Sequence, residues 1–251
     1  MRMKHCFLSV LFWLLLPFLA YAQKPVVTKK TFVVKGVSFE MVKIKGGSFS
    51  MGHSPVGEHA VPVHRVTLSD YYLGETEVTQ ELWTAVMGSN PSHWQGERLP
   101  VENVSWTDCC RFIGQLNRLT GMNFRMPTEA EWEFAAKGGR LSQAYVYAGS
   151  NNLGDVAWYK GNCSRTHEVA SKQPNELGLF DMSGNVWECC SDYYAPYQDK
   201  KEKNPRGPAS GVCHVARGGS WFYTTGLCRT TTRFFNLDGR AFSSVGLRLA
   251  L

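Results

Sequence analysis

The stretch from Pro174 to Tyr194 carries the residues whose types and spacing point most directly to chemistry. It places two carboxylates, Asp181 and Glu188, on either side of the turn formers Gly184 and Asn185. A glycine-permitted turn can fold main-chain carbonyls back between two acids, and such a cage of oxygens suits a hard cation, calcium above all. The alternative is a tight loop whose acids accept hydrogen bonds from neighbouring N–H groups or pair with arginine. The spacing alone favours this second interpretation.

Cysteines form the second set of residues that could do chemistry. Beyond residue 22 the chain holds Cys109, Cys110, Cys163, Cys189, Cys190, Cys213 and Cys228. In an exported protein of this size we expect disulfide bonds, and the odd number leaves at least one thiol unpaired within the chain. The adjacent Cys109 and Cys110 point about 100° apart on a helix, so we expect them to have different partners. The absence of a CxxC pair argues against structural zinc.

Basic residues are scattered along the chain, which has a formal net charge of +6, so we expect no nucleic-acid partner. Arg217, Arg229, Arg233 and Arg248 could border a groove for an acidic or peptide partner. The alternative is that most of them pair with the 21 acidic residues. We favour ion pairing, because arginine is common on protein surfaces and an isolated surface pair contributes only ~0–1 kcal/mol.

Three sequence blocks carry a family resemblance. GLFDMSGNVWE begins at Gly178, RMPTEAEWEFAAKGG at Arg125 and RGGSW at Arg217. Together they resemble the sulfatase-modifying-factor family, whose best-known member is formylglycine-generating enzyme, over about Phe39 to Leu251. The resemblance implies the formylglycine-generating-enzyme type of C-type-lectin-like fold, an α+β fold with little regular secondary structure. A shared scaffold does not by itself imply a shared reaction.

The resemblance also implies an oxidase centre, and here the sequence departs from the family. In formylglycine-generating enzyme, two cysteines five residues apart, just beyond the GGS turn, hold copper(I), because soft thiolates select that ion. The second position is Cys228, but the first is Tyr223. A phenol with a pKa near 10 is a hard, mostly protonated donor at neutral pH and cannot replace a thiolate. We therefore do not expect the copper site, although Cys213, ahead of the turn, could supply a second thiolate.

Other family positions are retained. Trp187 and Ser220 match the tryptophan and serine that line the enzyme's oxygen and substrate pocket, although core packing and a turn would also explain them. The resemblance further implies one calcium ion. Its expected ligands are the side chains of Asp181 and Glu188 and the main-chain carbonyls of Gly184 and Val186.

These residues must be positioned by a chain that we expect to form one domain. Residues 1–22 combine a basic start, an apolar run and Ala20-Tyr21-Ala22, which is typical of a cleavable secretory signal. Residues 23–36 are predicted to be a flexible lead-in, and 37–251 the sulfatase-modifying-factor-like domain. We expect an exported protein, in a periplasm, on the cell surface or secreted, with no membrane span after signal cleavage.

The helix signals are local. A cap at Thr79 predicts a short helix that ends at Gly88. A second helix is expected to follow Ser105, and a capping box of Thr128 with Glu131 predicts the start of a third.

The strand signals are weaker. Residues 37–52 suggest a hairpin that turns at Gly46-Gly47, and 64–68, 71–73 and 244–249 suggest further strands. Past Arg140 the regular signals fade. Such a long irregular region in a compact domain is usually functional, or held by metal or disulfides.

Two functions are consistent with these observations. The first is a binding or scaffold module in the cell envelope, which has lost the two-cysteine copper centre and holds a protein or glycan. The second is a formylglycine-generating oxidase, or a related metal-dependent oxidoreductase, that uses Cys228 to act on a cysteine of a target protein such as a sulfatase peptide. The tyrosine at position 223 favours the first.

Overall fold

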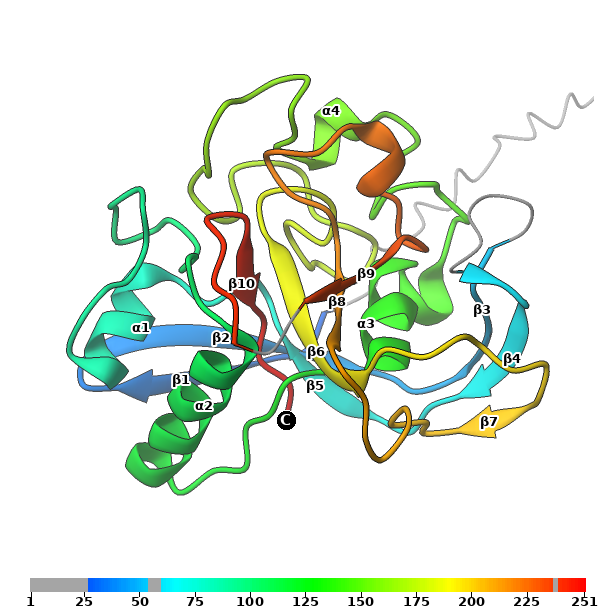
Figure 1. Cartoon of the computed structure of the whole chain (residues 1–251), viewed down its shortest axis with the longest axis horizontal. Coiled ribbons are helices and arrows are strands. Elements are labelled where there is room, and N and C mark those ends of the chain that lie inside the picture. The colour runs from blue at the N-terminus through cyan, green and yellow to red at the C-terminus, as the bar shows by residue number, and fades with distance from the viewer. Residues whose placement is uncertain (1–26, 54–59, 237–238) are drawn as a thin grey trace, which may run out of the picture.

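The structure of the protein is a computed structural model that describes residues 27–53, 60–236 and 239–251 (Figure 1). The predicted signal peptide and the first residues of the predicted lead-in lie outside the described residues. Within the described ranges, three small sheets and four short α-helices are joined by long irregular segments. This arrangement confirms the predicted α+β class.

The first sheet begins inside the segment predicted to be a flexible lead-in. Its antiparallel strands are β1 (Lys29–Val34), β2 (Val37–Ile44) and β5 (Tyr71–Gly74), in the order β1-β2-β5. The lead-in prediction is wrong for residues 29–34, because Lys35 and Gly36 adopt positive φ values of 47° and 86° and return the chain onto β1 as a tight hairpin. Phe32 stacks on Phe39 across this pair, with ring centroids 5.6 Å apart.

The second sheet contains β3 (Ser48–Met51), β4 (His64–Thr67) and β7 (Glu202–Lys203). The predicted hairpin over residues 37–52 is wrong, because β2 and β3 belong to different sheets. A Cβ atom at Gly46 would lie 2.3 Å from the carbonyl oxygen of Leu68. Glycine at this position therefore lets the chain pass close to its neighbour between the two sheets instead of reversing.

The central sheet contains β10 (Val245–Leu247), β6 (Trp187–Tyr193), β8 (His214–Arg217) and β9 (Arg233–Asn236), in that order. β10 runs parallel to β6, and the other neighbours are antiparallel. The residues after β10 then pair with β5: the N–H groups of Tyr72 and Leu251 donate to each other's carbonyls at 2.9 and 3.0 Å. The end of the chain thus joins the central sheet to the first.

The helices are α1 (Gln80–Met87), α2 (Trp106–Thr120), α3 (Glu129–Ala136) and α4 (Leu153–Val156), with short 3₁₀ turns η2 (Gly139–Leu141) and η3 (Thr225–Leu227). The predicted caps are confirmed. Thr79 caps α1, while Ser105 and Thr128 form complete capping boxes at α2 and α3. Gly88 ends α1 with a left-handed φ of 80°.

Two large apolar clusters form most of the core. One packs α1 and α2 against the first and central sheets, and the other surrounds α3, which lies beside β6 and β8 (Figure 1). Segment 157–186 contains no helix or strand, as the fading sequence signals predicted. None of the helices in the described ranges is both long enough and apolar enough to cross a membrane.

Candidate functional site

The turn-rich loop before β6 holds its two acids in buried hydrogen bonds. Asp181 accepts from the N–H of Ala170 through Oδ2 at 2.7 Å, and its buried Oδ1 has no partner among the described residues. Glu188 is fully buried and accepts from the Arg248 guanidinium at 2.6 and 2.9 Å, and from Nε1–H of Trp132 at 2.6 Å. The interpretation favoured by spacing alone, acids bound to N–H groups and arginine, is confirmed.

A third buried acid, Glu77, holds the same loop and was missed in the sequence. It accepts from Nδ2–H of Asn185 at 2.8 Å and from the N–H of Val186 at 3.1 Å. Burial, followed by the charges of Asp181 and Glu188, raises the pKa of Glu77 well above its usual value. Burial also raises the pKa of Asp181 to about 6. No local pattern marks Glu77, because Asn185 lies 108 residues further along the chain.

This arrangement meets the requirements of the predicted calcium site only in part. Oδ1 of Asp181 is a buried oxygen without a donor, the kind of atom that a bound cation satisfies. Glu188 does not fit as a ligand here, because both its oxygens are held by Arg248. Across the described ranges, no three His, Cys, Asp or Glu side chains are grouped to hold a metal ion. Calcium stays a prediction, which rests on Asp181 and the carbonyls of Gly184 and Val186.

Cys228 lacks the surroundings of a metal-binding thiolate. It is fully buried in an apolar cluster with Leu153, Val156 and Ala157. Burial raises the pKa of its thiol to about 12, although a hydrogen bond from the backbone of Ser220 acts in the opposite direction. At neutral pH the thiol is therefore protonated, whereas metal binding requires the thiolate.

The other predicted pocket residues surround one another as packed core. The ring of Tyr223 meets that of Trp187 edge to face at 5.6 Å, and Trp187 stacks on Phe234 at 5.0 Å. Ser220 is fully buried and closes a turn, since its carbonyl accepts from the N–H of Tyr223 at 3.0 Å. Packing and turn geometry thus account for these residues without an oxygen pocket.

The expected disulfides are not found at five of the seven positions. The thiols of Cys109, Cys163, Cys189, Cys190 and Cys228 are all free. The thiol of Cys109 instead forms a hydrogen bond with that of Cys189, which helps to raise its pKa. Cys213 lies just before β8, where its carbonyl accepts from the N–H of Tyr194 at 2.8 Å, while Cys228 follows η3.

We expect Cys228 to resist alkylation in the folded protein. With a pKa of about 12, fewer than about one thiol in 10,000 is ionised at pH 7.5, and burial blocks the reagent. Iodoacetamide treatment followed by peptide mass spectrometry should leave Cys228 unmodified under native conditions and label it fully in denaturant. Labelling of native Cys228 within minutes would show an accessible thiolate and contradict this assignment.

Three of the four arginines considered in the sequence form buried ion pairs. Arg217 pairs with Glu133, and both are fully buried. Arg233 binds Glu129 through two hydrogen bonds of 2.6 and 2.8 Å, and Arg248 binds Glu188 as described above. The interpretation that these arginines pair with acids is confirmed for these three, although Arg233 also lines a cavity. Arg229 lines a separate surface cavity.

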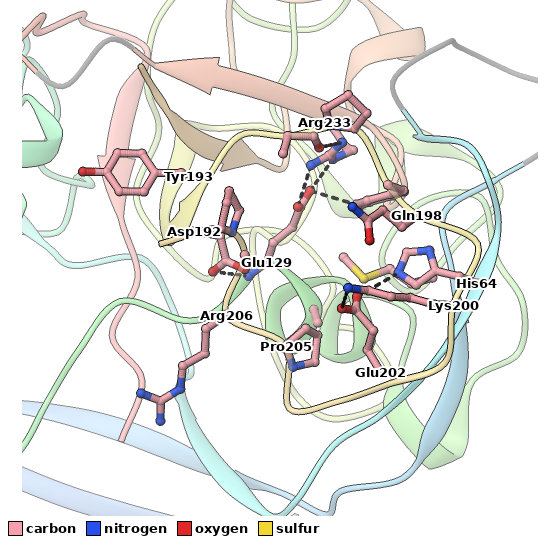
Figure 2. A pocket seen from close by; sticks show the side chains of 17 residues that line it. His64, Glu129, Asp192, Tyr193, Gln198, Lys200, Glu202, Pro205, Arg206 and Arg233 are labelled. Carbon is pink, nitrogen blue, oxygen red and sulfur yellow. Dashed lines mark hydrogen bonds and ion pairs between the residues drawn. The ribbon is translucent and has the colours of Figure 1, made fainter. Parts of the chain in front are cut away.

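A cavity of about 240 Å³, not predicted from the sequence, lies beside Glu129 and Arg233 (Figure 2). Its wall is formed by the N-terminal end of α3, the end of β6 and residues 195–208. Most of its charged groups are paired within the wall. Nζ of Lys200 lies 3.1 Å from the Glu202 carboxylate, and Nε2 of His64 lies 3.9 Å from it.

Asp192, near the end of β6, is a second buried acid of this cavity beside Glu129. Its Oδ2 accepts from the N–H of Glu129 at 3.0 Å and from the hydroxyl of Ser191 at 2.9 Å. Burial, followed by the charge of Glu129, raises the pKa of Asp192 to about 7. A single acid in an alternating strand gives no such signal in the sequence.

A chain of aromatic rings forms a second feature that the sequence did not predict. Successive ring centroids lie 4.8 to 6.1 Å apart. In order, the members of this aromatic strip are Trp94, Trp221, Phe222, Tyr223, Phe234, Phe235 and Tyr194. Phe222 is 54% exposed and Phe235 45% exposed, whereas Tyr223 and Phe234 pack against the core. Three members of the strip, Trp221, Phe222 and Tyr223, directly follow the GGS turn.

Comparisons with known proteins agree on one family. The family described as "Sulfatase-modifying factor enzyme 1-like domain" matches residues 30–251. The match begins within β1. The chaperone protein LppX of Paenibacillus barcinonensis is 33% identical over 236 residues, which covers 74% of this chain and 79% of that protein. A formylglycine-generating enzyme of Streptomyces coelicolor is 29% identical over 283 residues, covering 83% and 88%.

A solved structure gives the same result for the fold. Treponema denticola variable protein 1 matches with a TM-score of 0.84 and 36% identity, over 90% of this chain and 99% of that one. The likeness confirms the predicted C-type-lectin-like fold of the formylglycine-generating-enzyme type.

Proposed function

The chain belongs to the sulfatase-modifying factor enzyme 1-like domain family, and from this premise we propose that it is a binding module of that family without the copper oxidase centre. Family relatives carry different names, among them a chaperone protein and formylglycine-generating enzymes. Membership therefore fixes the scaffold but leaves the function to the site. We further propose that the protein is exported and acts in the cell envelope, which the signal-like residues 1–22 support.

The observation that carries this proposal is the state of the two positions that would hold copper. One is Tyr223, whose ring packs against Trp187, and the other is Cys228, a buried thiol with a pKa of about 12. Cu(I) needs soft, ionised thiolates that a substrate cysteine can approach. With a tyrosine at one of the two positions, the pair of thiolates is missing.

The alternative function is a formylglycine-generating oxidase that acts on a sulfatase peptide. The retained Trp187 and Ser220 support this alternative. Both are fully buried, and packing and turn formation account for them. A direct assay separates the two functions. We expect the purified protein to bind no Cu(I) through Cys228 and to leave the cysteine of a CxPxR peptide unchanged in air.

The aromatic strip supplies a contact surface for the binding module. Its exposed members, Phe222 and Phe235, are apolar rings that a protein partner can bury, and we propose a protein as the partner. Exposed aromatic rings over a rigid base are typical of the residues that contribute most to protein interfaces. Lys160 Nζ lies 5.8 Å from the centre of the Phe222 ring and adds a positive charge at the edge.

We expect the double variant Phe222→Ser, Phe235→Ser to bind its protein partner at least about tenfold more weakly, because buried aromatic contacts are worth roughly 2 kcal/mol or more at an interface. The measurement is capture by crosslinking from an envelope extract of the organism that makes the protein, followed by mass spectrometry and titration of the captured partner. Stability should change less than for a core residue, since both rings are about half exposed.

The matched control is Val212→Ser, because Val212 is 85% exposed and lies outside the strip. This variant should capture the partner as the parent does. Equal capture by all three proteins would exclude the strip as the contact surface. Conversion of the CxPxR cysteine to formylglycine would instead exclude the loss of the oxidase centre.

A further inference from the structure

Asp192 is a buried acid that the cavity of Figure 2 leaves without an ion-pair partner. It is 4% exposed, and its Oδ2 is fully used by the N–H of Glu129 and the hydroxyl of Ser191. Among the described residues, both hydrogen bonds to the Asp192 carboxylate reach Oδ2, and the ion pairs of this wall join Arg233 to Glu129 and Lys200 to Glu202 without including Asp192. A carboxylate so deeply buried is costly unless its charge is matched by a partner.

The space in front of Oδ1 is kept open by Gly207, which also lines the cavity. This residue has a φ of 68°, and a Cβ atom added to it would lie 3.3 Å from Oδ1 of Asp192 and 2.9 Å from its Cβ. Any other residue would therefore fill the approach to the carboxylate.

The remaining charges of the wall cannot neutralise Asp192. Arg233 is held by Glu129, and Lys200 is held by Glu202. Figure 2 shows the guanidinium of Arg206 directed away from Asp192. The cavity therefore has room for one positive charge from outside the chain, which would favour the ionised form of Asp192.

We propose that this cavity binds a primary alkylammonium group, with the ammonium on Oδ1 of Asp192. A single available oxygen suits a compact ammonium better than a guanidinium, which binds both oxygens of a carboxylate in a fork. The walls suit the methylene chain behind the ammonium, since they include Pro196, Pro205, Pro208 and the ring of Tyr197. This site is separate from the aromatic strip and does not depend on the function proposed above.

The same chemistry occurs in a lysine side chain and in a free diamine, and two probes distinguish them. Nα-acetyl-lysine methylamide represents the side chain of a protein, and 1,5-diaminopentane represents the free amine. Nα,Nε-diacetyl-lysine methylamide and Nα-acetyl-arginine methylamide are the negative probes, because the first carries no ammonium group and the second carries a guanidinium in its place. Binding to the whole purified protein is measured by calorimetry or by NMR titration.

We expect Asp192→Asn to weaken binding of the preferred amine by about 10- to 100-fold, the loss typical of a hydrogen bond to a charged group. Asparagine keeps an oxygen for the N–H of Glu129, so the start of α3 is preserved. The control is Asp199→Asn, which removes the same charge from an exposed residue that does not line the cavity. This control should bind as the parent does.

The pH dependence gives a second readout that needs no variant. The charged groups facing Asp192 are Glu129 and Glu131 on α3 and Arg125 before it, and the titratable Cys190 thiol on β6 stays neutral because burial raises its pKa. With a pKa of about 7, Asp192 is about one-tenth ionised at pH 6 and nine-tenths at pH 8, so the affinity should rise about tenfold over this interval. Binding at pH 6.5 should release protons, which calorimetry in two buffers detects.

Several results would overturn the proposal. They are the absence of amine binding at about 10 mM, equal binding of Nα,Nε-diacetyl-lysine methylamide, or an affinity that does not change between pH 6 and 8. Equal affinity of a folded Asp192→Asn variant would also overturn it. His64 also lines the cavity, so a pH profile that persists in Asp192→Asn would assign the titration to that histidine and count against Asp192.

Discussion

Replacement of Glu188 by alanine is expected to lower the free energy of unfolding by about 3–5 kcal/mol. The variant leaves the Arg248 guanidinium fully buried without its carboxylate. Two of its remaining hydrogen bonds, to the carbonyls of Gly74 and Phe180, satisfy N–H groups but do not neutralise the charge. Trp132 loses the acceptor of its Nε1–H as well. Urea denaturation followed by tryptophan fluorescence measures the effect.

The double variant Glu188→Leu, Arg248→Met is the control, because it removes both charges from the same site. Replacing a buried ion pair by apolar side chains of similar volume is often close to neutral, so the double variant should recover most of the loss. The measurement should be repeated with calcium and with chelator. If Glu188 acts as the partner of Arg248, its loss costs the same in both. A cost that appears only with calcium would make Glu188 a metal ligand.

The second large effect is expected for Gly184→Ala, at about 3 kcal/mol or more. Gly184 has a φ of 83°, which costs an L-residue roughly 1–2 kcal/mol. The new Cβ would also lie 2.4 Å from the carbonyl oxygen of Trp158. That oxygen accepts from the N–H of Asn185 and belongs to the backbone, so it cannot move cheaply.

Gly88→Ala separates these two contributions. Gly88 has nearly the same φ, 80°, but a Cβ there would meet nothing within 4 Å. We therefore expect a loss of only about 1–2 kcal/mol from the backbone conformation. Thermal unfolding of the two variants side by side measures the difference. Equal losses would mean that the contact with Trp158 costs nothing.

The parts of the fold that could be predicted were those decided by residues close together in the sequence. Thr79, Ser105 and Thr128 each start a helix because the capping contacts lie within three residues. The hairpin expected at Gly46 failed for the opposite reason. Strand pairing depends on contacts between distant segments, and the glycine serves a close approach to Leu68 that no local pattern reveals.

In the candidate site, too, only the features decided by nearby residues could be predicted. Spacing was enough to favour hydrogen bonds and arginine pairing for Asp181 and Glu188, but it could not identify Arg248, 60 residues further along, as the partner. The departure at Tyr223 was visible in the sequence, whereas the burial of Cys228 was not. The cavity at Asp192 could not be predicted, because its walls come from α3, β6 and the segment around Gly207.

The ion pairs at the centre of the molecule also bear on how the chain reaches its native state. Arg248 binds both Glu188 and the carbonyl of Gly74, and Gly74 lies 174 residues before Arg248 in the chain. Such contacts reward the chain only after very large loops have closed, and the entropy of closure is lost first. A domain organised in this way has high contact order, so its folding is slow and its partly folded forms expose charged groups that still lack their counterparts.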